Sequence, residues 1–127
     1  MKYTLIAGFL FLNVSLHAQL SVYNRADTTY PVFAGGNEAW LNFLKTKLHP
    51  QTPVIHKAPA GTYIVTVSFF IDTTGKVCAV TIVNDPGYGT GNDVLNAFQH
   101  CPSWIPGILN NRKIICRQQQ DITYWVN

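Results

Sequence analysis

The sequence predicts an α+β domain in which two helices pack on one face of a three-stranded antiparallel sheet. Two stretches repeat apolar residues at the three- and four-residue steps of a helix, and three others alternate in polarity or are rich in β-branched residues. These elements follow in the order helix, strand, strand, helix, strand. Two amphipathic helices on one side of such a sheet are the simplest way to bury these apolar stripes. The opposite face of the sheet is expected to be partly wet or to meet a partner.

The first helix is expected to begin at Asn37, whose side chain is a suitable N-cap. Glu38 would then lie in the first turn, near the positive end of the helix dipole. Pro50 and Pro53 stop the helix, and residues 49–61 are predicted to form a loop. The apolar stripe of this helix consists of Ala39, Trp40, Phe43, Leu44 and Leu48.

Residues 62–72 are predicted to form a half-buried antiparallel strand, because a strongly apolar face alternates strictly with a milder one. A turn at residues 72–75 follows, with Gly75 free to take the positive φ that such turns often need. The chain then returns as a second strand over residues 76–84, which are dense in valine and isoleucine. The apolar face of the first strand carries Tyr63, Val65, Val67, Phe69 and Ile71.

The glycine-rich residues 85–91 are predicted to connect this hairpin to a second helix, which Asn92 caps and Pro102 ends. This connection lacks the Lys-Ser/Thr ending of a phosphate-binding P-loop. A last strand is expected over residues 112–126. One face of that strand carries Ile114, Cys116, Gln118, Gln120, Ile122, Tyr124 and Val126.

The N-terminus is predicted to be a secretory signal peptide over residues 1–18. A short positive start precedes the mostly apolar residues 3–16, and Ala18 is the small residue that signal peptidase prefers before its cut. The apolar stretch is shorter than the about 20 residues that a membrane-spanning helix needs. An uncleaved membrane anchor is the alternative. Residues 19–32 are then a short polar lead-in, and residues 33–127 form the folded domain.

The composition excludes two classes of protein. Hydrophobic residues make up 47% of the chain and charged residues 12%, whereas disordered segments combine low hydrophobicity with high charge. The net charge is only +3, and no basic cluster exceeds the pair Arg112–Lys113. A nucleic-acid binder that works through a broad basic surface is therefore not expected.

No catalytic or metal-binding pattern stands out in the sequence. The aspartates at positions 72, 85 and 93 fall at turns or at a helix start, where capping is their common role. His49, His56 and His100 lie far apart and lack the spacing of metal ligands. We therefore expect a binding module that is not an enzyme and has no metal or cofactor.

The three cysteines allow at most one intramolecular disulfide. Cys101 ends the predicted second helix, and Cys116 lies on the inward stripe of the last strand. A Cys101–Cys116 bridge is therefore conceivable in an oxidising compartment, with Cys78 free. Three buried free thiols are the alternative.

Four motifs in the chain occur together in one protein family. They are Phe33-x-Gly35-Gly36, Val67-x-Phe69-x-Ile71-Asp72-x-x-Gly75-x-Val77, Gly87-Tyr88-Gly89 and Pro102-x-Trp104-x-Pro106-Gly107. Together with the closing Asn110-Asn111-Arg112 and Ile122-Thr123-Tyr124, they resemble the C-terminal domain of TonB-family energy transducers, in the form common in Bacteroidetes. The resemblance covers residues 33–126.

The resemblance implies a periplasmic domain that grips a short N-terminal segment, the TonB box, of outer-membrane transporters. In the family the segment adds as a strand beside the last strand of the sheet, where unpaired backbone groups give affinity with modest sequence demand. The docking strand here would carry the partner-binding residues Arg117, Gln118, Gln119, Gln120, Ile122 and Tyr124. A glutamine run that merely faces solvent is the alternative for positions 118–120.

Two departures from the family pattern limit what is carried over. A complete transducer has a retained transmembrane helix and a long Pro-rich stretch, and neither is expected here, so this chain would not convey the proton-motive force by itself. Asp121 stands where related sequences often have proline. A self-associating structural protein that pairs two copies through the same sheet edge, and a truncated anchored transducer, remain the other candidate functions.

Overall fold

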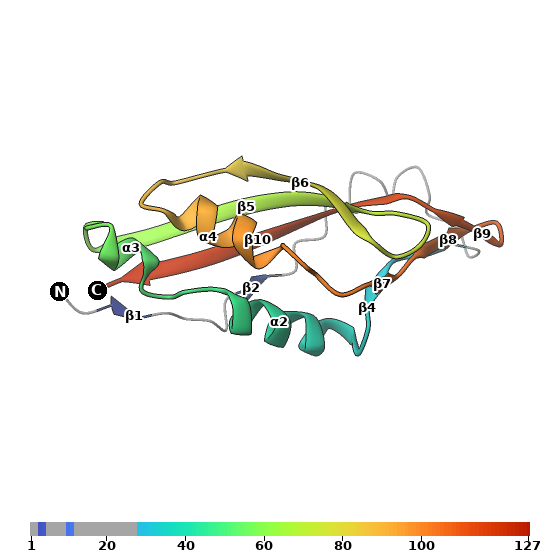
Figure 1. The fold of residues 1–127 in the computed structure, drawn as a ribbon, viewed down its shortest axis with the longest axis horizontal. Coiled ribbons are helices and arrows are strands. Elements are labelled where there is room, and N and C mark those ends of the chain that lie inside the picture. The colour runs from blue at the N-terminus through green and yellow to red at the C-terminus, as the bar shows by residue number, and fades with distance from the viewer. Residues whose placement is uncertain (1–2, 5–9, 12–27) are drawn as a thin grey trace.

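Two long antiparallel strands, β5 (Gly61–Ile71) and β10 (Cys116–Val126), form the centre of the structure. They pair over their whole length without a register shift, from Gly61 opposite Val126 to Ile71 opposite Cys116. The strand β6 (Val77–Asn84) continues the sheet beyond β5. Figure 1 shows this computed structural model, in which β5 and β10 run along the whole sheet. The structure describes residues 3–4, 10–11 and 28–127.

The other side of β10 pairs with the N-terminal chain. The short strands β1 (Tyr3–Thr4) and β2 (Leu10–Phe11) both lie antiparallel to β10 and complete a five-stranded main sheet. In Figure 1 they lie on the side of β10 that is away from β5. The rest of the predicted signal peptide, and residues 19–27 of the predicted lead-in, lie outside the described residues.

Two small sheets pair the segment before the first helix with the segment that leads to β10. The strand β3 (Thr28–Thr29) pairs with β8 (Gly107–Leu109), which in turn pairs with β9 (Arg112–Ile114). The strand β4 (Val32–Phe33) pairs with β7 (Trp104–Ile105). These pairings bring together parts of the chain that are far apart in sequence.

Three helices are found in the described residues: α2 (Gly36–Lys47), α3 (Thr52–Ile55) and α4 (Thr90–Ala97). Both α2 and α4 start one or two residues before the predicted caps, and each is preceded by a glycine with positive φ and no side-chain cap. The prediction that asparagine side chains cap these helices is therefore wrong. No helix in the described part of the chain is long and apolar enough to cross a membrane.

The predicted fold class, two helices on a three-stranded sheet, is wrong. The described residues form three sheets, the largest with five strands. The helix α3 lies within residues 49–61, which were expected to be a loop, because Pro53 is tolerated in a first helical turn. The expected last strand divides at Ile115 into β9 and β10, which join different sheets. Periodicity along one segment does not reveal such pairings between distant segments.

The central hairpin agrees with the sequence prediction. The carboxylate of Asp72 accepts hydrogen bonds from the backbone N–H groups of Thr74 at 2.8 Å and Lys76 at 2.9 Å. Gly75 has φ 87°, and the carbonyl oxygen of Gly75 accepts the N–H of Trp104 at 2.7 Å. A Cβ atom at Gly75 would lie 1.9 Å from the carbonyl oxygen of Trp104. Both the turn and the close approach of β7 therefore require glycine.

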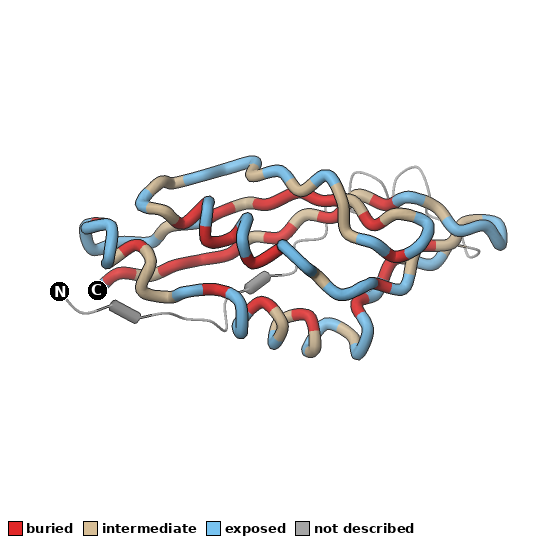
Figure 2. Tube along the Cα trace, viewed as in Figure 1, coloured by how far each residue is buried: buried red, intermediate tan, exposed pale blue. Residues whose placement is uncertain are grey.

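The core lies between the helices and one face of the main sheet. Figure 2 shows the buried positions concentrated along β5, β10 and the inner sides of the helices. Trp40 on α2 is fully buried, with ring centroids 4.9 Å from Trp104, 5.2 Å from Phe33 and 5.9 Å from Phe69. The predicted apolar faces of β5 and β10 are both confirmed as the faces that meet this core. The buried members are Val65, Val67, Phe69, Ile71, Cys116, Gln118, Gln120, Ile122, Tyr124 and Val126.

Candidate functional site

The second side of β10 is the candidate binding edge. The described residues pair with it at four positions: Tyr3 opposite Val126, Thr4 opposite Trp125, Leu10 opposite Ile122, and Phe11 opposite Asp121. The first side of β10, in contrast, pairs with β5 at all eleven positions. One side of β10 is therefore paired with β5 along its whole length, and the described N-terminal strands pair with its other side at four positions.

The predicted docking residues divide between the two faces of the main sheet. Gln118, Gln120, Ile122 and Tyr124 face the helices, and none of them is more than 1% exposed. The alternative, in which the glutamine run merely faces solvent, is therefore wrong for Gln118 and Gln120. These six residues share the backbone of one strand, and their side chains do not form a single surface.

Gln120 has a structural role in the core. Its Oε1 atom accepts a hydrogen bond of 2.9 Å from the indole N–H of Trp40, and its Nε2 atom donates to the carbonyl oxygen of Asp121 at 3.0 Å. Both Trp40 and Gln120 are fully buried. This contact fixes the middle of β10 against α2, because each partner would otherwise leave a buried polar group unsatisfied.

Arg117 and Gln119 lie on the face of β10 that points away from the helices, where both are partly exposed. Arg117 donates a long hydrogen bond of 3.4 Å to Gln119. Asp121 on the same face accepts a hydrogen bond of 2.8 Å from the hydroxyl of Thr66 on β5. Arg117 and Gln119 are therefore the members of the predicted docking set that stay partly exposed, and Asp121 lies on the same face.

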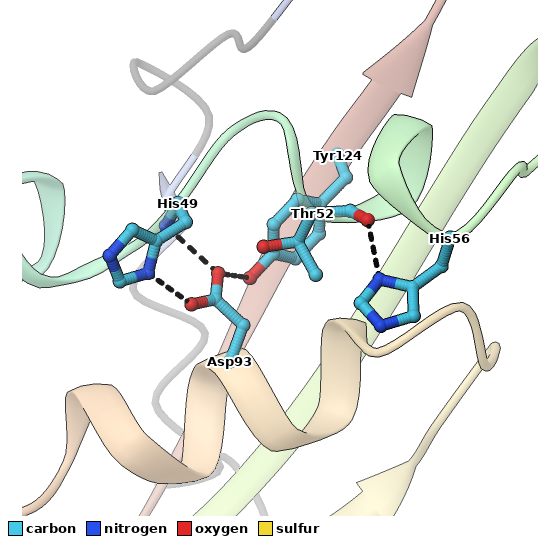
Figure 3. A network of polar contacts seen from close by, with 5 residues as sticks. All are labelled: His49, Thr52, His56, Asp93 and Tyr124. Carbon is cyan, nitrogen blue, oxygen red and sulfur yellow. Dashed lines mark hydrogen bonds and ion pairs between the residues drawn. The ribbon is translucent and has the colours of Figure 1, made fainter.

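A polar network centred on Asp93 holds the C-terminal half of β10 (Figure 3). One carboxylate oxygen of Asp93 accepts the hydroxyl of Tyr124 at 2.7 Å and the backbone N–H of His49 at 2.9 Å. The other carboxylate oxygen lies 2.7 Å from Nδ1 of His49. An ionised carboxylate only accepts hydrogen bonds, so Nδ1 carries the proton. The network joins the connection between α2 and α3, the first half of α4, and β10.

The environment of the network differs between its two ends. The side chain of Asp93 is 6% exposed, whereas that of His49 is 66% exposed. Burial, together with the neighbouring Asp93 carboxylate, raises the pKa of Tyr124 above its ordinary value. His56, next to the network in Figure 3, contacts the carbonyl oxygen of Thr52 through Nδ1 at 2.9 Å. Within the described residues, the Asp93 carboxylate forms its hydrogen bonds with His49 and Tyr124. Its role is therefore to hold these two residues, and with them β10, against α4.

Sequence reasoning missed this network. Asp93 was interpreted as a residue at a helix start and His49 as part of a loop, and the two are 44 residues apart. No local pattern marks such a pair. The described part of the chain holds no group of three or more His, Cys, Asp or Glu residues that could bind a metal ion.

The cysteines are free thiols in the structure, so the conceivable bridge between Cys101 and Cys116 is not formed. Burial raises the pKa of Cys101 to about 11 and also raises that of Cys116. The Cys116 thiol packs against Gly107, where an added Cβ atom would lie 2.6 Å from the sulfur. The Cys116 thiol therefore belongs to the packing between β8 and β10, whereas Cys101 is partly buried and packs against the hydrophobic core.

Comparison with known proteins does not identify a relative. No protein-family model, no curated protein and no solved structure matches this chain. The resemblance to TonB C-terminal domains, and the function that it implies, therefore stay predictions.

Proposed function

We propose that this chain is a binding module that takes up an extended peptide segment as an antiparallel strand on the second side of β10. The observation that carries this proposal is the pairing of β10 with β1 and β2, two strands from the other end of the chain. A strand edge offers a row of backbone N–H and C=O groups, so that affinity comes from the backbone and demands little of the partner's sequence.

The regularity of β10 supports this choice of edge. The strand is eleven residues long, and its register with β5 does not shift. At the opposite edge of the main sheet, the pairing of β5 with β6 shifts register between Thr66 and Val67 and between Ser68 and Phe70 of β5. Ala79 in β6 also has φ 52°. Such irregularities obstruct the addition of another strand. The sheet therefore favours strand addition at β10.

The side-chain contacts of β10 also favour binding. The hydrogen bonds from Trp40 to Gln120 and from Tyr124 to Asp93 attach the strand at two points to the helices behind it. A strand that is already fixed loses little conformational entropy when a partner adds to it. The edge is therefore preorganised for a partner strand.

The partner we propose is the N-terminal segment of an outer-membrane transporter, and the compartment is the periplasm. The motif resemblance over residues 33–126 supports this partner, and the predicted signal peptide supports export. Arg117, Gln119 and Asp121 would then lie beside the added strand on the accessible face of the sheet. Their polar side chains favour a segment with polar residues at alternate positions.

Backbone NMR of the ¹⁵N-labelled chain, titrated with synthetic peptides from transporter N-termini, tests the proposal. We expect amide shifts along residues 116–126 and unchanged amides in β6. Two control peptides carry N-methyl groups at odd or at even positions, and only one of them should lose binding, because alternate N–H groups of an added strand face its neighbour. Binding that tolerates both N-methylated peptides, or no shift along β10 with any of these peptides, would contradict strand addition.

A further inference from the structure

The hairpin of β8 and β9 forms one end of the structure, opposite the end that carries α3 (Figure 1). Its two strands join at Asn110 and Asn111, whose φ values of 52° and 62° give the tight two-residue turn that matches the twist of paired strands. Within the described residues, β9 is the outer strand of its small sheet. This hairpin takes no part in strand addition at β10.

Each face of the hairpin combines an aliphatic with a basic side chain. Leu109 lies opposite Arg112 on one face, and Ile108 lies opposite Lys113 on the other. Arg112 and Lys113 are exposed, and the two aliphatic residues are partly exposed. We call these four residues the hairpin tip. Because both faces carry the same mixture, a flat protein surface would contact only half of it.

Two exposed isoleucines lie at the base of the hairpin. Ile105 ends β7, two residues before β8 begins, and Ile115 directly follows β9. Their side chains are 57% and 62% exposed. Groups of exposed apolar side chains with polar neighbours mark surfaces that meet another protein or a membrane. Apolar side chains are therefore accessible at the base of the hairpin as well as at its tip.

The basic charge of the chain is concentrated around this hairpin. Between Asp93 and Asp121 the sequence contains Arg112, Lys113 and Arg117, and no Asp or Glu. The net charge of this stretch therefore equals the +3 of the whole chain, and the remaining six basic and six acidic residues offset each other. An anion that approaches the hairpin meets no carboxylate on β8 or β9. The hairpin is therefore complementary in charge to an anionic partner.

We propose that the hairpin of β8 and β9 docks this module on an anionic membrane surface. Arg112 and Lys113 contact the lipid phosphates, and the aliphatic side chains beside them enter the interface. A fluid interface surrounds the tip and contacts both of its faces, which a rigid protein surface cannot do. A second copy of the chain is not the expected occupant, because charged residues on an outer strand oppose pairing with another strand. Docking and strand addition use different strands, so either can fail without the other.

Binding of the full chain to lipid vesicles tests the inference. Co-sedimentation compares vesicles of equal parts phosphatidylglycerol and phosphatidylcholine with vesicles of phosphatidylcholine alone. At low salt, partitioning to the anionic vesicles should be stronger by about tenfold or more. The difference should largely vanish at about 0.5 M NaCl, because salt screens the attraction. Equal partitioning to both kinds of vesicle at low salt would overturn the inference.

Two double variants test whether the charges of the hairpin carry the binding. Arg112→Gln combined with Lys113→Gln should weaken binding to anionic vesicles by about tenfold or more, since each basic residue near such a surface strengthens binding about fivefold. Lys45→Gln combined with Lys47→Gln removes the same charge from the exposed surface of α2 and should change binding by less than about threefold. Both variants leave the apolar N-terminus unchanged. An equal loss in the two would show that net charge alone attracts the chain, and would overturn docking by the hairpin.

Two serine variants test the apolar contribution. Ile115→Ser should weaken binding by about threefold or more, because a smaller apolar side chain then enters the interface. Ile55→Ser on α3, where the isoleucine is 65% exposed, is the matched control and should leave binding unchanged. Circular dichroism confirms that each variant keeps the fold of the wild type. Equal effects of the two serine variants would contradict insertion at the hairpin.

Paramagnetic broadening locates the contact on the ¹⁵N-labelled full chain. Bicelles that contain phosphatidylglycerol and a spin-labelled lipid should broaden the amides of residues 108–115, and those of α3 should stay sharp. Broadening that leaves residues 108–115 unaffected would overturn the inference. Binding of polyglutamate at residues 108–115, without binding to anionic vesicles, would assign the hairpin to an acidic polypeptide and would also overturn it.

Discussion

Trp40 and Gln120 are joined by a buried hydrogen bond of 2.9 Å across 80 residues of sequence. The bond connects α2 to the middle of the strand that we propose as the docking edge. A glutamine in the core of a small domain is unusual, and here it has a donor of matching geometry. Gln120, which the sequence placed among the partner-binding residues, therefore helps to hold β10 in place through its side chain.

Replacing Gln120 with methionine should destabilise the fold by about 1–3 kcal/mol, because the indole N–H of Trp40 then stays buried without an acceptor. Gln119→Met on the opposite face is the matched control and should change the free energy of unfolding by less than about 0.5 kcal/mol. Urea unfolding followed by tryptophan fluorescence measures both. Equal stability of the two variants would show that the Trp40–Gln120 bond contributes little.

Tyr124→Phe should cost about 1.5–3 kcal/mol, because the buried carboxylate of Asp93 loses a hydroxyl donor. The wild type should also lose stability above about pH 10, where an unfolded tyrosine ionises. The sign follows from linkage: the raised pKa keeps Tyr124 protonated in the fold, so the stabilisation is present below pH 10 and declines as the pH rises.

Urea unfolding at several pH values between 8 and about 11 checks this contribution as the difference between the wild type and Tyr124→Phe. The difference should be constant at the lower pH values and shrink above about pH 10. Tyr30→Phe serves as the control for a tyrosine outside the network. A wild-type advantage that grows with pH would contradict the assignment.

Gly75→Ala should be much more destabilising than Gly87→Ala, although both glycines have φ near 90°. Alanine at either position is strained by about 1 kcal/mol or more in this region of φ. Only at Gly75 does the added Cβ atom also meet backbone, at 1.9 Å from the Trp104 carbonyl oxygen, whereas nothing lies within 4 Å at Gly87. Thermal unfolding of the two variants separates strain from collision. Similar melting temperatures would mean that β7 can move away from the hairpin turn.

The thiols provide a prediction about chemistry. Three free thiols should be counted in denatured protein without reductant, since no bridge is formed. In the folded protein Cys101 should react slowly with an alkylating agent at pH 8, because burial holds its pKa near 11 and little thiolate is present. Unfolding should accelerate the reaction. A count of one free thiol in the denatured protein would show that a bridge forms in solution.

Local patterns in the sequence were sufficient for the elements whose contacts are close along the chain. The hairpin of β5 and β6, its Asp72–Gly75 turn and the main course of α2 follow from alternation, turn residues and helical spacing. The inward stripe of β10 from Cys116 to Val126 was also predictable, because a strand with one buried face must alternate. In each case the deciding interactions lie within one segment or between neighbours.

Only the tertiary structure decided the rest. The pairing of β4 with β7 and of β3 with β8, the acceptor for Trp40, and the Asp93 network all join segments that are distant in sequence. The pairing of β1 and β2 with the second side of β10 also joins segments that are distant in sequence. These contacts form wherever the packed core brings a donor close to a matching acceptor. The sequence alone does not show which distant residues come close in space. The sequence therefore determined which strand has an inward face, and the tertiary structure determined what lies on each side of it.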